Sequence, residues 1–344
     1  MIETLLPTTV VGSYSVPEWL ERAKGDFHEG RISKTSLNEI YDTAIKAALK
    51  DQERAGVDIV SDGELRRDND IDYFLERMPG IELPKLAKVH YYDYFDAAVR
   101  APLPAPETGA GLRLVNDFSF TREQTDRPIK FSFTGPFSLA KRIRNEAYAA
   151  PDELVLDIAR HLNREARELA AAGAAFLQID EPFLAGYPEA VPLVVKAVNL
   201  VVEGVDVEWG LHICYGNRHA RPAWEGHYDF LFPEILGAQV DQLVLEFARK
   251  GYDDVALFKK YHPSFKLGLG VIDVKSEIVE TPDQVAKRVD RALAVLDPEC
   301  IVVNPDCGLR HLPTKIAVAK LRAMNAGAAI ARARVRGEKV PLPA

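Results

Sequence analysis

The chain has 344 residues, of which 47% are hydrophobic and 27% charged, and its formal net charge is −8. This balance is typical of a globular protein with a large core. No segment is basic enough to indicate a nucleic-acid or anionic-membrane surface, so we expect neither partner. The start, MIETLLPTTVVGS, does not resemble a secretory leader, and no apolar run approaches the ~18 residues that span a bilayer. Three cysteines argue against a disulfide scaffold. We expect a cytoplasmic protein with a small-molecule partner, and the composition leaves a homodimer open.

Strand-like apolar runs alternate with helical patterns along the chain. Eight runs predict buried strands, namely residues 8–14, 59–65, 130–135, 176–182, 207–214, 242–248, 266–273 and 301–307. The clearest helical patterns are residues 37–55, 151–172, 282–296 and 313–331, and the last three open with a proline. Because such alternation implies parallel strands, the sequence predicts an α/β fold, a single (β/α)₈ TIM barrel over residues 1–344.

The connection 66–127 interrupts this alternation. It has about 60 residues, which is too long for a simple strand-to-helix loop, and it contains the proline-rich stretch APLPAPETG. It follows the second predicted strand, on the side where barrel enzymes carry their active sites. We therefore expect an insertion with structure of its own that forms a lid over this face.

Chemically active residues gather at the predicted carboxyl ends of the strands, where barrel enzymes place catalytic groups. They are Gly12, Ser13, Asp62, Glu64, Asp180, Glu181, His212, Cys214, Glu246, Asp273, Asp306 and Cys307. Several carboxylates buried together are costly unless something cationic lies among them. A metal ion and an amino group would both satisfy this requirement.

His212 and Cys214 are two residues apart, so they share one face if the strand continues through them. A lone histidine or cysteine in a strand is more often structural than a ligand. Together with Cys307 and Glu246 at later strand ends, however, the pair supplies the ligand types of a catalytic zinc site. Glu246 has a second interpretation, because it could simply pair with Arg249.

These motifs together resemble the catalytic domain of cobalamin-independent methionine synthase. TTVVGSY, SDGELRRDNDIDYF, FTGP, LQIDEP, LHIC, LVLEFA, GLGVIDVKS and VNPDCGL follow the family's order over nearly the whole chain. The resemblance implies a (β/α)₈ barrel with one Zn²⁺ bound by His212, Cys214, Glu246 and Cys307. It also implies that Val11, Gly12 and Ser13 bind the carboxylate of homocysteine, and that Glu64 and Asp180 hold its ammonium group.

The chain departs from the longer members of that family in two respects. No N-terminal barrel is expected, because the first predicted strand begins near residue 8. In GLGVIDVKS, Lys275 occupies the position at which the long enzymes have a proton-relaying histidine. We therefore place Lys275 and the nearby Asp273 in the catalytic set with Glu246. We expect the methyl donor to be methylcobalamin or another methylcorrinoid, free or on a corrinoid protein, rather than polyglutamyl methyl-folate.

Three alternative functions remain open at this stage. A zinc enzyme of the same superfamily could alkylate another thiol, such as coenzyme M, but the sulfonate of that thiol would require cations rather than Glu64 and Asp180. A metal-free barrel resembling uroporphyrinogen decarboxylase would need arginines for propionate groups. A non-catalytic corrinoid-binding protein would have no use for four ligands at four strand positions.

Overall fold

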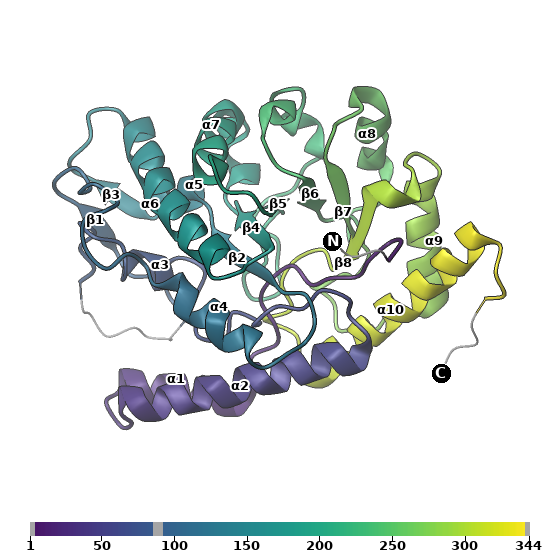
Figure 1. Cartoon of the computed structure of the whole chain (residues 1–344), viewed down its shortest axis with the longest axis horizontal. Coiled ribbons are helices and arrows are strands. Elements are labelled where there is room, and N and C mark those ends of the chain that lie inside the picture. Colours follow the sequence, from purple (N-terminus) through teal and green to yellow (C-terminus); the bar gives the residue numbers. More distant parts are fainter. Residues whose placement is uncertain (1–3, 85–91, 341–344) are drawn as a thin grey trace.

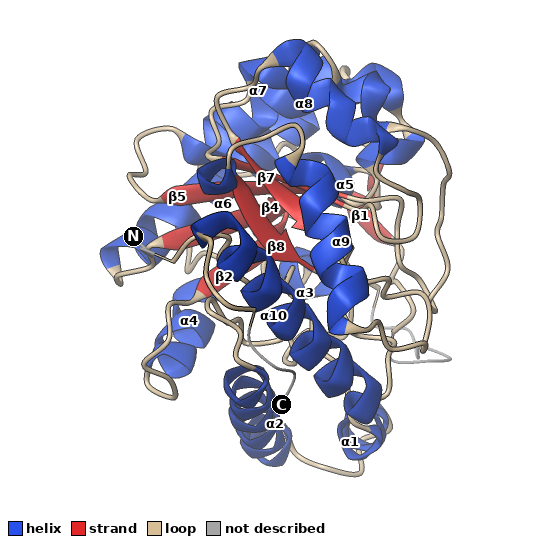
Figure 2. Ribbon diagram, turned by 90° about the vertical axis from the view of Figure 1, so that its right-hand side faces the viewer, coloured by secondary structure: helices blue, strands red, loops and turns tan. Residues whose placement is uncertain are grey.

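The fold is built on a parallel sheet surrounded by helices (Figures 1 and 2). The structure is a computed structural model that describes residues 4–84 and 92–340. Six strands lie in the order β2-β4-β5-β6-β7-β8. They are β2 (Lys130–Thr134), β4 (Phe176–Asp180), β5 (Glu208–Ile213), β6 (Gln242–Leu245), β7 (Lys266–Gly270) and β8 (Ile301–Asn304). The helices are α1 (Glu18–His28), α2 (Lys34–Ala55), α3 (Asp72–Leu75), α4 (Leu114–Arg122), α5 (Pro136–Ala140), α6 (Pro151–Ala171), α7 (Val191–Val202), α8 (Ala256–Tyr261), α9 (Pro282–Leu293) and α10 (Thr314–Arg336). The α/β class and the parallel sheet predicted from the sequence are confirmed.

The first two predicted strands are wrong as strands, because each forms only single bridges. Residues 8–9 bridge to Val303 of β8 and to Ile59, and Val60 bridges to Ile129, directly before β2. All three bridges are parallel. Backbone pairing therefore continues from β8, one edge of the sheet, through these two short segments to β2 at the other edge.

The second of these segments cannot extend further because the chain turns sharply after residue 60. Gly63 and Glu64 have φ angles of +70° and +56°, and consecutive left-handed residues are incompatible with a strand. The Asp62 carboxylate accepts a hydrogen bond from the Glu64 N–H at 2.9 Å and stabilises this turn. The turn directs the Glu64 side chain towards Gly12 and Ser132.

The six strands of the sheet begin within one residue of their predicted starts but end one to three residues early. Cys214, Glu246 and Cys307, which were predicted inside strands 5, 6 and 8, lie just beyond them. Pro305, which has no N–H to donate, directly follows β8. These three candidate ligands therefore lie on short loops at the carboxyl edge of the sheet, whereas His212 lies within β5.

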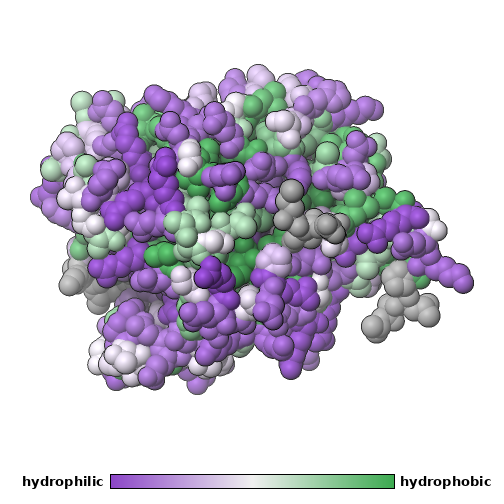
Figure 3. Space-filling view, in the orientation of Figure 1, coloured by the Kyte–Doolittle hydropathy of each residue, from purple (hydrophilic) through white to green (hydrophobic). Residues whose placement is uncertain are grey.

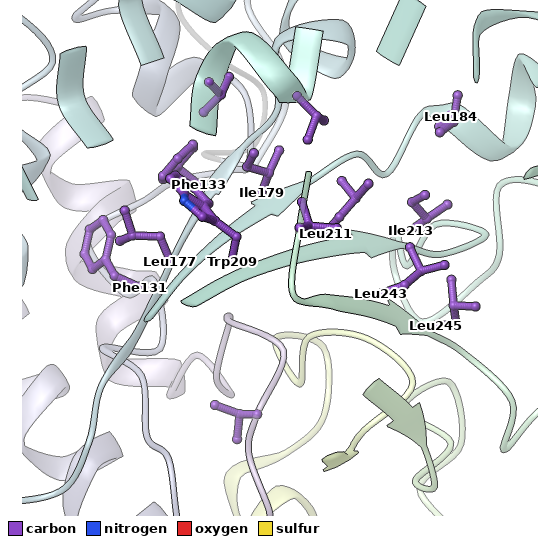
Figure 4. Packing of buried hydrophobic residues seen from close by; sticks show 14 of the residues in the cluster. Phe131, Phe133, Leu177, Ile179, Leu184, Trp209, Leu211, Ile213, Leu243 and Leu245 are labelled. Atoms are coloured by element: carbon purple, nitrogen blue, oxygen red, sulfur yellow. The ribbon is translucent and has the colours of Figure 1, made fainter. Parts of the chain in front are cut away.

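Alternation along the strands separates the core from the site. One set of positions carries large apolar side chains in matched rows across neighbouring strands, including Phe133, Ile179, Leu211 and Leu243 (Figure 4). The intervening positions are buried as well but largely polar or small, as in the row Ser132, Gln178, Gly210 and Gln242. In that second set, the register pairs Asp180 of β4 with His212 of β5.

The predicted helices are present with small shifts at their ends. Pro151 and Pro282 occupy first-turn positions of α6 and α9, as expected, whereas Pro313 precedes α10, which begins at Thr314. The view of Figure 1, drawn by hydropathy in Figure 3, shows a mostly hydrophilic surface over the helices, with hydrophobic side chains near its centre. Among the described residues, no helix combines the length and apolar character required to cross a membrane.

The connection 66–127 carries structure of its own in its described part. It contains α3, the short strand β1 (Ala97–Val99) and α4. Strand β1 pairs in parallel with β3 (Ile143–Asn145), which lies between β2 and α6, to form a second, two-stranded sheet. The sequence patterns did not predict this small sheet. It joins the 66–127 connection to the loop that follows β2.

Candidate metal centre

Three of the four predicted metal ligands come together at the carboxyl edge of the sheet. His212 lies in β5, Cys214 directly follows that strand, and Cys307 lies in the loop after β8. Their ligand atoms all lie within 4.8 Å of one another, and the two Sγ atoms are 3.5 Å apart. Ligands of one tetrahedral zinc ion are separated by roughly 3.5–4 Å. The three side chains therefore fit a zinc ion bound by two sulfurs and one nitrogen.

The orientation of His212 supports this interpretation. Its Nδ1 lies 3.1 Å from Oδ1 of Asp180, its cross-strand neighbour. Its Nε2 is buried and has no hydrogen-bond partner among the described residues. A histidine that binds a metal through one nitrogen commonly donates its other N–H to a carboxylate. The observed pattern leaves Nε2 available as the ligand atom once the imidazole is neutral, with Nδ1 directed at Asp180.

The electrostatic environment of these residues favours a cation. Burial lowers the pKa of His212, but the Asp180 carboxylate and the Cys307 sulfur raise it to about 10. The hydrogen bond shared with Cys214 lowers the pKa of Cys307 well below its usual value, in spite of burial. The same shared hydrogen bond, together with burial, raises the pKa of Cys214. Negative charge gathered in a buried site is the setting in which a divalent ion is held tightly.

Glu246, the fourth predicted ligand, is not part of this group of three. Its side chain is completely buried, and its Oε2 lies 2.9 Å from Nζ of Lys275. Its Oε1 lies 3.3 Å from Nη2 of Arg249, and Oε2 also accepts a hydrogen bond from the Tyr215 N–H at 3.3 Å. Burial lowers the pKa of Lys275, but Cys307, Glu246 and Cys214 together raise it above its ordinary value. Lys275 therefore remains a cation beside the candidate ligands.

Asp273 lies in the same loop as Lys275 but does not line the cavity beside the metal ligands. Its Oδ1 accepts a hydrogen bond from the Lys275 N–H at 2.8 Å, which is a local turn interaction. Its own N–H donates to Glu280 at 2.9 Å. The geometry thus assigns Asp273 to the support of Lys275, and its predicted place in the catalytic set stays a prediction.

A cavity of about 100 Å³ adjoins the three ligands. Val11, Ser13, Glu64 and Asp180, which were predicted to bind an amino acid, line it together with His212, Cys214 and Cys307. Gly12 lies against Glu64, because a Cβ at that position would be 2.3 Å from Glu64 Oε1. The structure therefore brings all the predicted substrate-binding residues to one place.

Two of the carboxylates in this cavity already have partners. Glu64 Oε1 lies 3.1 Å from Nη1 of Arg67 and accepts a hydrogen bond from Ser132 Oγ at 2.7 Å. Asp180 Oδ1 accepts a hydrogen bond from Gln178 Nε2 at 2.7 Å, in addition to its contact with His212. These contacts engage one oxygen of each carboxylate and so fix the direction of the side chain.

The sequence analysis missed several residues of the cavity wall. They are Asp70, Tyr92, Pro182, Asn217, Gly308, Arg310 and His311. Arg310 and His311 follow the motif PDCGL, so their closeness to Cys307 along the chain was a usable signal. Asp70 and Tyr92 belong to the 66–127 connection, which is expected to cover this face, but no local pattern singles out these two residues.

Asp306 was noted at its strand end but given no role. Its carboxylate accepts hydrogen bonds from the backbone N–H groups of Phe247, Ala248 and Arg249, at 2.9, 2.8 and 3.0 Å. It thereby ties the loop that follows Glu246 to the loop that carries Cys307. Burial raises the pKa of Asp306 to about 7, with a further contribution from Glu246.

Comparison with known proteins identifies the family. Residues 6–330 match the family described as "Cobalamin-independent synthase, Catalytic domain". A methionine synthase of Sulfurisphaera tokodaii is 36% identical over 338 residues, which cover 97% of this chain and 95% of that protein. A methionine synthase of Thermococcus kodakarensis is also 36% identical, over 341 residues that cover 98% of this chain and 97% of that protein.

A solved structure agrees with these sequence matches. The B12-independent methionine synthase from a Shewanella species, in complex with selenomethionine, has a TM-score of 0.85 and 28% sequence identity to this chain. The similarity covers 97% of this chain and 100% of that one. The resemblance seen in the sequence motifs is thus confirmed over nearly the full length, and the chain belongs to the cobalamin-independent methionine synthase family, matching its catalytic domain.

Proposed function

We propose that this protein transfers a methyl group to the thiol of homocysteine and so forms methionine, with zinc bound by His212, Cys214, Cys307 and Glu246. The observation that carries the proposal is the convergence of two thiols and a buried, unpartnered imidazole nitrogen beside a small cavity lined with carboxylates. The family, whose curated relatives are named methionine synthases, supports the same reaction.

The chemical requirement at such a site is a thiolate, because a free aliphatic thiol is largely protonated at neutral pH. Zinc bound here supplies the positive charge that holds a thiol in its deprotonated form. Asp180 orients the His212 ring, and the sulfurs of Cys214 and Cys307 keep the surroundings rich in electrons. In this environment a substrate sulfur stays nucleophilic towards a donor methyl group.

The cavity favours an amino-acid thiol over a thiol with a sulfonate. Glu64, Asp70 and Asp180 line it, and they suit an ammonium group. Arg310 lines it as well, but its guanidinium donates to the carbonyl oxygens of Asp68 and Arg67, both at 3.1 Å. The Shewanella relative holds selenomethionine, an amino acid of the expected product type. Coenzyme M is therefore the weaker candidate, and the decarboxylase-like interpretation has no support in the comparisons.

The methyl donor is a separate question. A methylcorrinoid is the donor expected from Lys275 and from the expected lack of an N-terminal barrel, but the family is described as cobalamin-independent, which argues against that donor. The most informative assay supplies homocysteine with methylcobalamin, methyl-folate monoglutamate or methyl-folate triglutamate in parallel. Turnover with methylcobalamin alone would support the corrinoid donor, and turnover with either folate would replace it.

We also propose that the chain forms one (β/α)₈ barrel in which the bridged segments near residues 8–9 and 59–60 complete the ring. The described part of the 66–127 connection would act as a lid, since Asp70 and Tyr92 line the cavity. Limited proteolysis with and without homocysteine tests the lid. Slower cleavage within this connection when homocysteine is present supports it, and unchanged cleavage contradicts it.

The central test of the proposed function is Cys307→Ser. Because Cys307 is one of three converging ligands, the variant should lose both bound zinc and homocysteine methylation, measured by metal analysis and by methionine formation. Cys300→Ser is the matched control, since Cys300 is an exposed free cysteine outside the cavity. An active Cys307→Ser protein without zinc would refute the proposal.

A further inference from the structure

A buried ion pair lies directly beside the three converging ligands. Glu246 has a fully buried side chain, and that of Lys275 is only 4% exposed. The Lys275 Nζ to Glu246 Oε2 distance of 2.9 Å is that of a charge-assisted hydrogen bond. Removing two charges from water is costly. Glu246 is also a predicted metal ligand, so its pairing with Lys275 at this site requires an explanation.

The backbone of Lys275 is anchored by a series of hydrogen bonds. The Asp273 carboxylate binds its backbone N–H, and the backbone N–H of Asp273 donates in turn to Glu280. Glu280 is itself buried and lies 2.9 Å from Nζ of Lys320, which is fully buried in α10. These contacts therefore fix the backbone of the loop that carries Lys275, and the Lys275 side chain extends from it to Glu246.

Arg249, the other cation beside Glu246, is mostly engaged elsewhere. Its two terminal nitrogens each lie 2.9 Å from an oxygen of Glu225, whereas its distance to Glu246 is 3.3 Å. Lys275 is thus the principal partner of the Glu246 carboxylate. If Lys275 were absent, a buried Glu246 without a metal contact would keep only the longer contacts with Arg249 Nη2 and the Tyr215 N–H, both at 3.3 Å.

We propose that Lys275 is a positioning residue that receives the Glu246 carboxylate whenever a substrate thiol occupies the fourth position on the metal. This inference rests on the proposed function. A tetrahedral site with three protein ligands has one further position, for which Glu246 and the substrate sulfur would compete. Lys275 stabilises the arrangement in which Glu246 is displaced, and so favours substrate binding.

Replacing Lys275 should change zinc affinity and homocysteine affinity in different ways. General damage to the site would lower both affinities together. In Lys275→Met, Glu246 has no strong partner except zinc, so zinc should bind at least as tightly as in the unmodified protein. Homocysteine should bind roughly tenfold more weakly, because the Glu246 carboxylate that it must displace no longer has Lys275 as a partner. Lys275→Arg, which keeps the cation, should restore part of the homocysteine affinity.

The experiment measures zinc affinity by chelator competition and homocysteine affinity by calorimetry on the zinc-loaded protein. X-ray absorption at the zinc edge counts sulfur against nitrogen and oxygen ligands, with and without homocysteine. Lys250→Met is the matched control, because Lys250 is a nearby half-buried cation that packs on Tyr215 and is not paired with Glu246. It should leave both affinities unchanged.

A double-mutant cycle tests whether Lys275 acts on homocysteine binding through Glu246. In a Glu246→Gln background no carboxylate needs a partner, so Lys275→Met should no longer weaken homocysteine binding. Equal homocysteine affinity in Lys275→Met and the unmodified protein would overturn the inference, and so would parallel losses of zinc and homocysteine binding. Failure of the unmodified protein to bind zinc or homocysteine would instead overturn the proposed function.

Discussion

At the scale of single residues, close approach of backbone and side chains shapes the substrate site. Glu64 adopts a left-handed backbone conformation and points its carboxylate at the segment 11–13. Only a glycine at position 12 leaves room for it, since a Cβ there would lie 2.3 Å from Glu64 Oε1 and 2.6 Å from Ser132 Oγ. Gly12 was predicted as a substrate-binding residue, and the structure supplies this physical reason for its presence.

Gly12→Ala should therefore displace Glu64 and raise the KM for homocysteine roughly tenfold or more, since even about 1 Å of misplacement in a binding site is expensive. Zinc content should change little, because Gly12 does not touch the metal ligands. Gly25→Ala in α1 is the matched control, as no atom lies within 4 Å of the added Cβ. Steady-state kinetics on both variants check the prediction, which an unchanged KM for Gly12→Ala would contradict.

A second residue-scale prediction concerns pH. Glu181 accepts hydrogen bonds from the N–H groups of Phe137 and Ser138 and from Ser138 Oγ, yet burial raises its pKa to about 7. In an unfolded chain the pKa of a glutamate is about 4.3. The folded state therefore holds an extra proton between these values, and its contribution to stability, complete below about pH 4.3, is lost as the pH rises to about 7.

Glu181→Gln removes this titration. The free energy of unfolding of the unmodified protein should thus fall relative to that of the variant between pH 5 and pH 8. Urea denaturation of both proteins at the two pH values measures the difference. A constant difference would show that Glu181 ionises with the same pKa in the folded and unfolded states.

At the scale of elements, the sequence predicted the type and order of the strands better than their ends. Apolar runs marked β2 and β4 to β8 correctly, because buried parallel strands require such runs. The predicted runs also included Cys214 and Cys307, but both residues lie in the loops that follow β5 and β8. The contact between His212 and Asp180 depends on the register of two strands, which no local pattern encodes.

Tyr228 shows how two strand ends are held together. Its hydroxyl donates to the Ile213 carbonyl at 2.9 Å and accepts from the Glu246 N–H at 3.0 Å, so it bridges β5 and the end of β6. Tyr228→Phe leaves both buried backbone groups unsatisfied and should lower the free energy of unfolding by about 1–3 kcal/mol.

Tyr215→Phe is the control for this change. The two rings pack with centroids 5.1 Å apart, but the Tyr215 hydroxyl is buried without a hydrogen-bond partner among the described residues. Its removal should cost nothing or stabilise the protein slightly. Urea denaturation distinguishes the two variants, and an equal effect would mean that the Tyr228 hydroxyl contributes no specific bridge.

At the scale of the whole molecule, helix α10 is hydrogen-bonded to residues 5–6 near the start of the described chain. Arg332 in α10 donates from Nε to the Leu5 carbonyl and from Nη2 to the Leu6 carbonyl, at 2.8 and 2.9 Å, and Nη2 also lies 2.6 Å from the Asp58 carboxylate. These contacts hold residues 5–6 just before the bridge to β8. No local sequence pattern predicts them, because they join positions that are at least 274 residues apart.

Arg332→Met should lower the free energy of unfolding by about 2 kcal/mol, because it leaves partly buried carbonyls without donors and Asp58 without its cation. Arg334→Met, two residues further along the same helix, removes an arginine that is 40% exposed and paired with Asp290. Exposed pairs of this kind contribute little. Faster amide hydrogen exchange near residue 8 in Arg332→Met alone would confirm the link, and identical exchange in both variants would argue against it.

The contact between Ser13 and the loop after Cys307 has a consequence for protein synthesis. The Leu309 N–H donates to the Ser13 carbonyl at 2.8 Å, and a Cβ on Gly308 would lie 1.9 Å from Ser13 Oγ. The two walls of the cavity thus come from segments that are far apart along the chain. A nascent chain halted before residue 300 lacks both Cys307 and Val303, the residue of β8 to which Thr8 bridges. The cavity should therefore form only once residues 301–309 have been synthesised, and a chain truncated before residue 300 should not bind homocysteine.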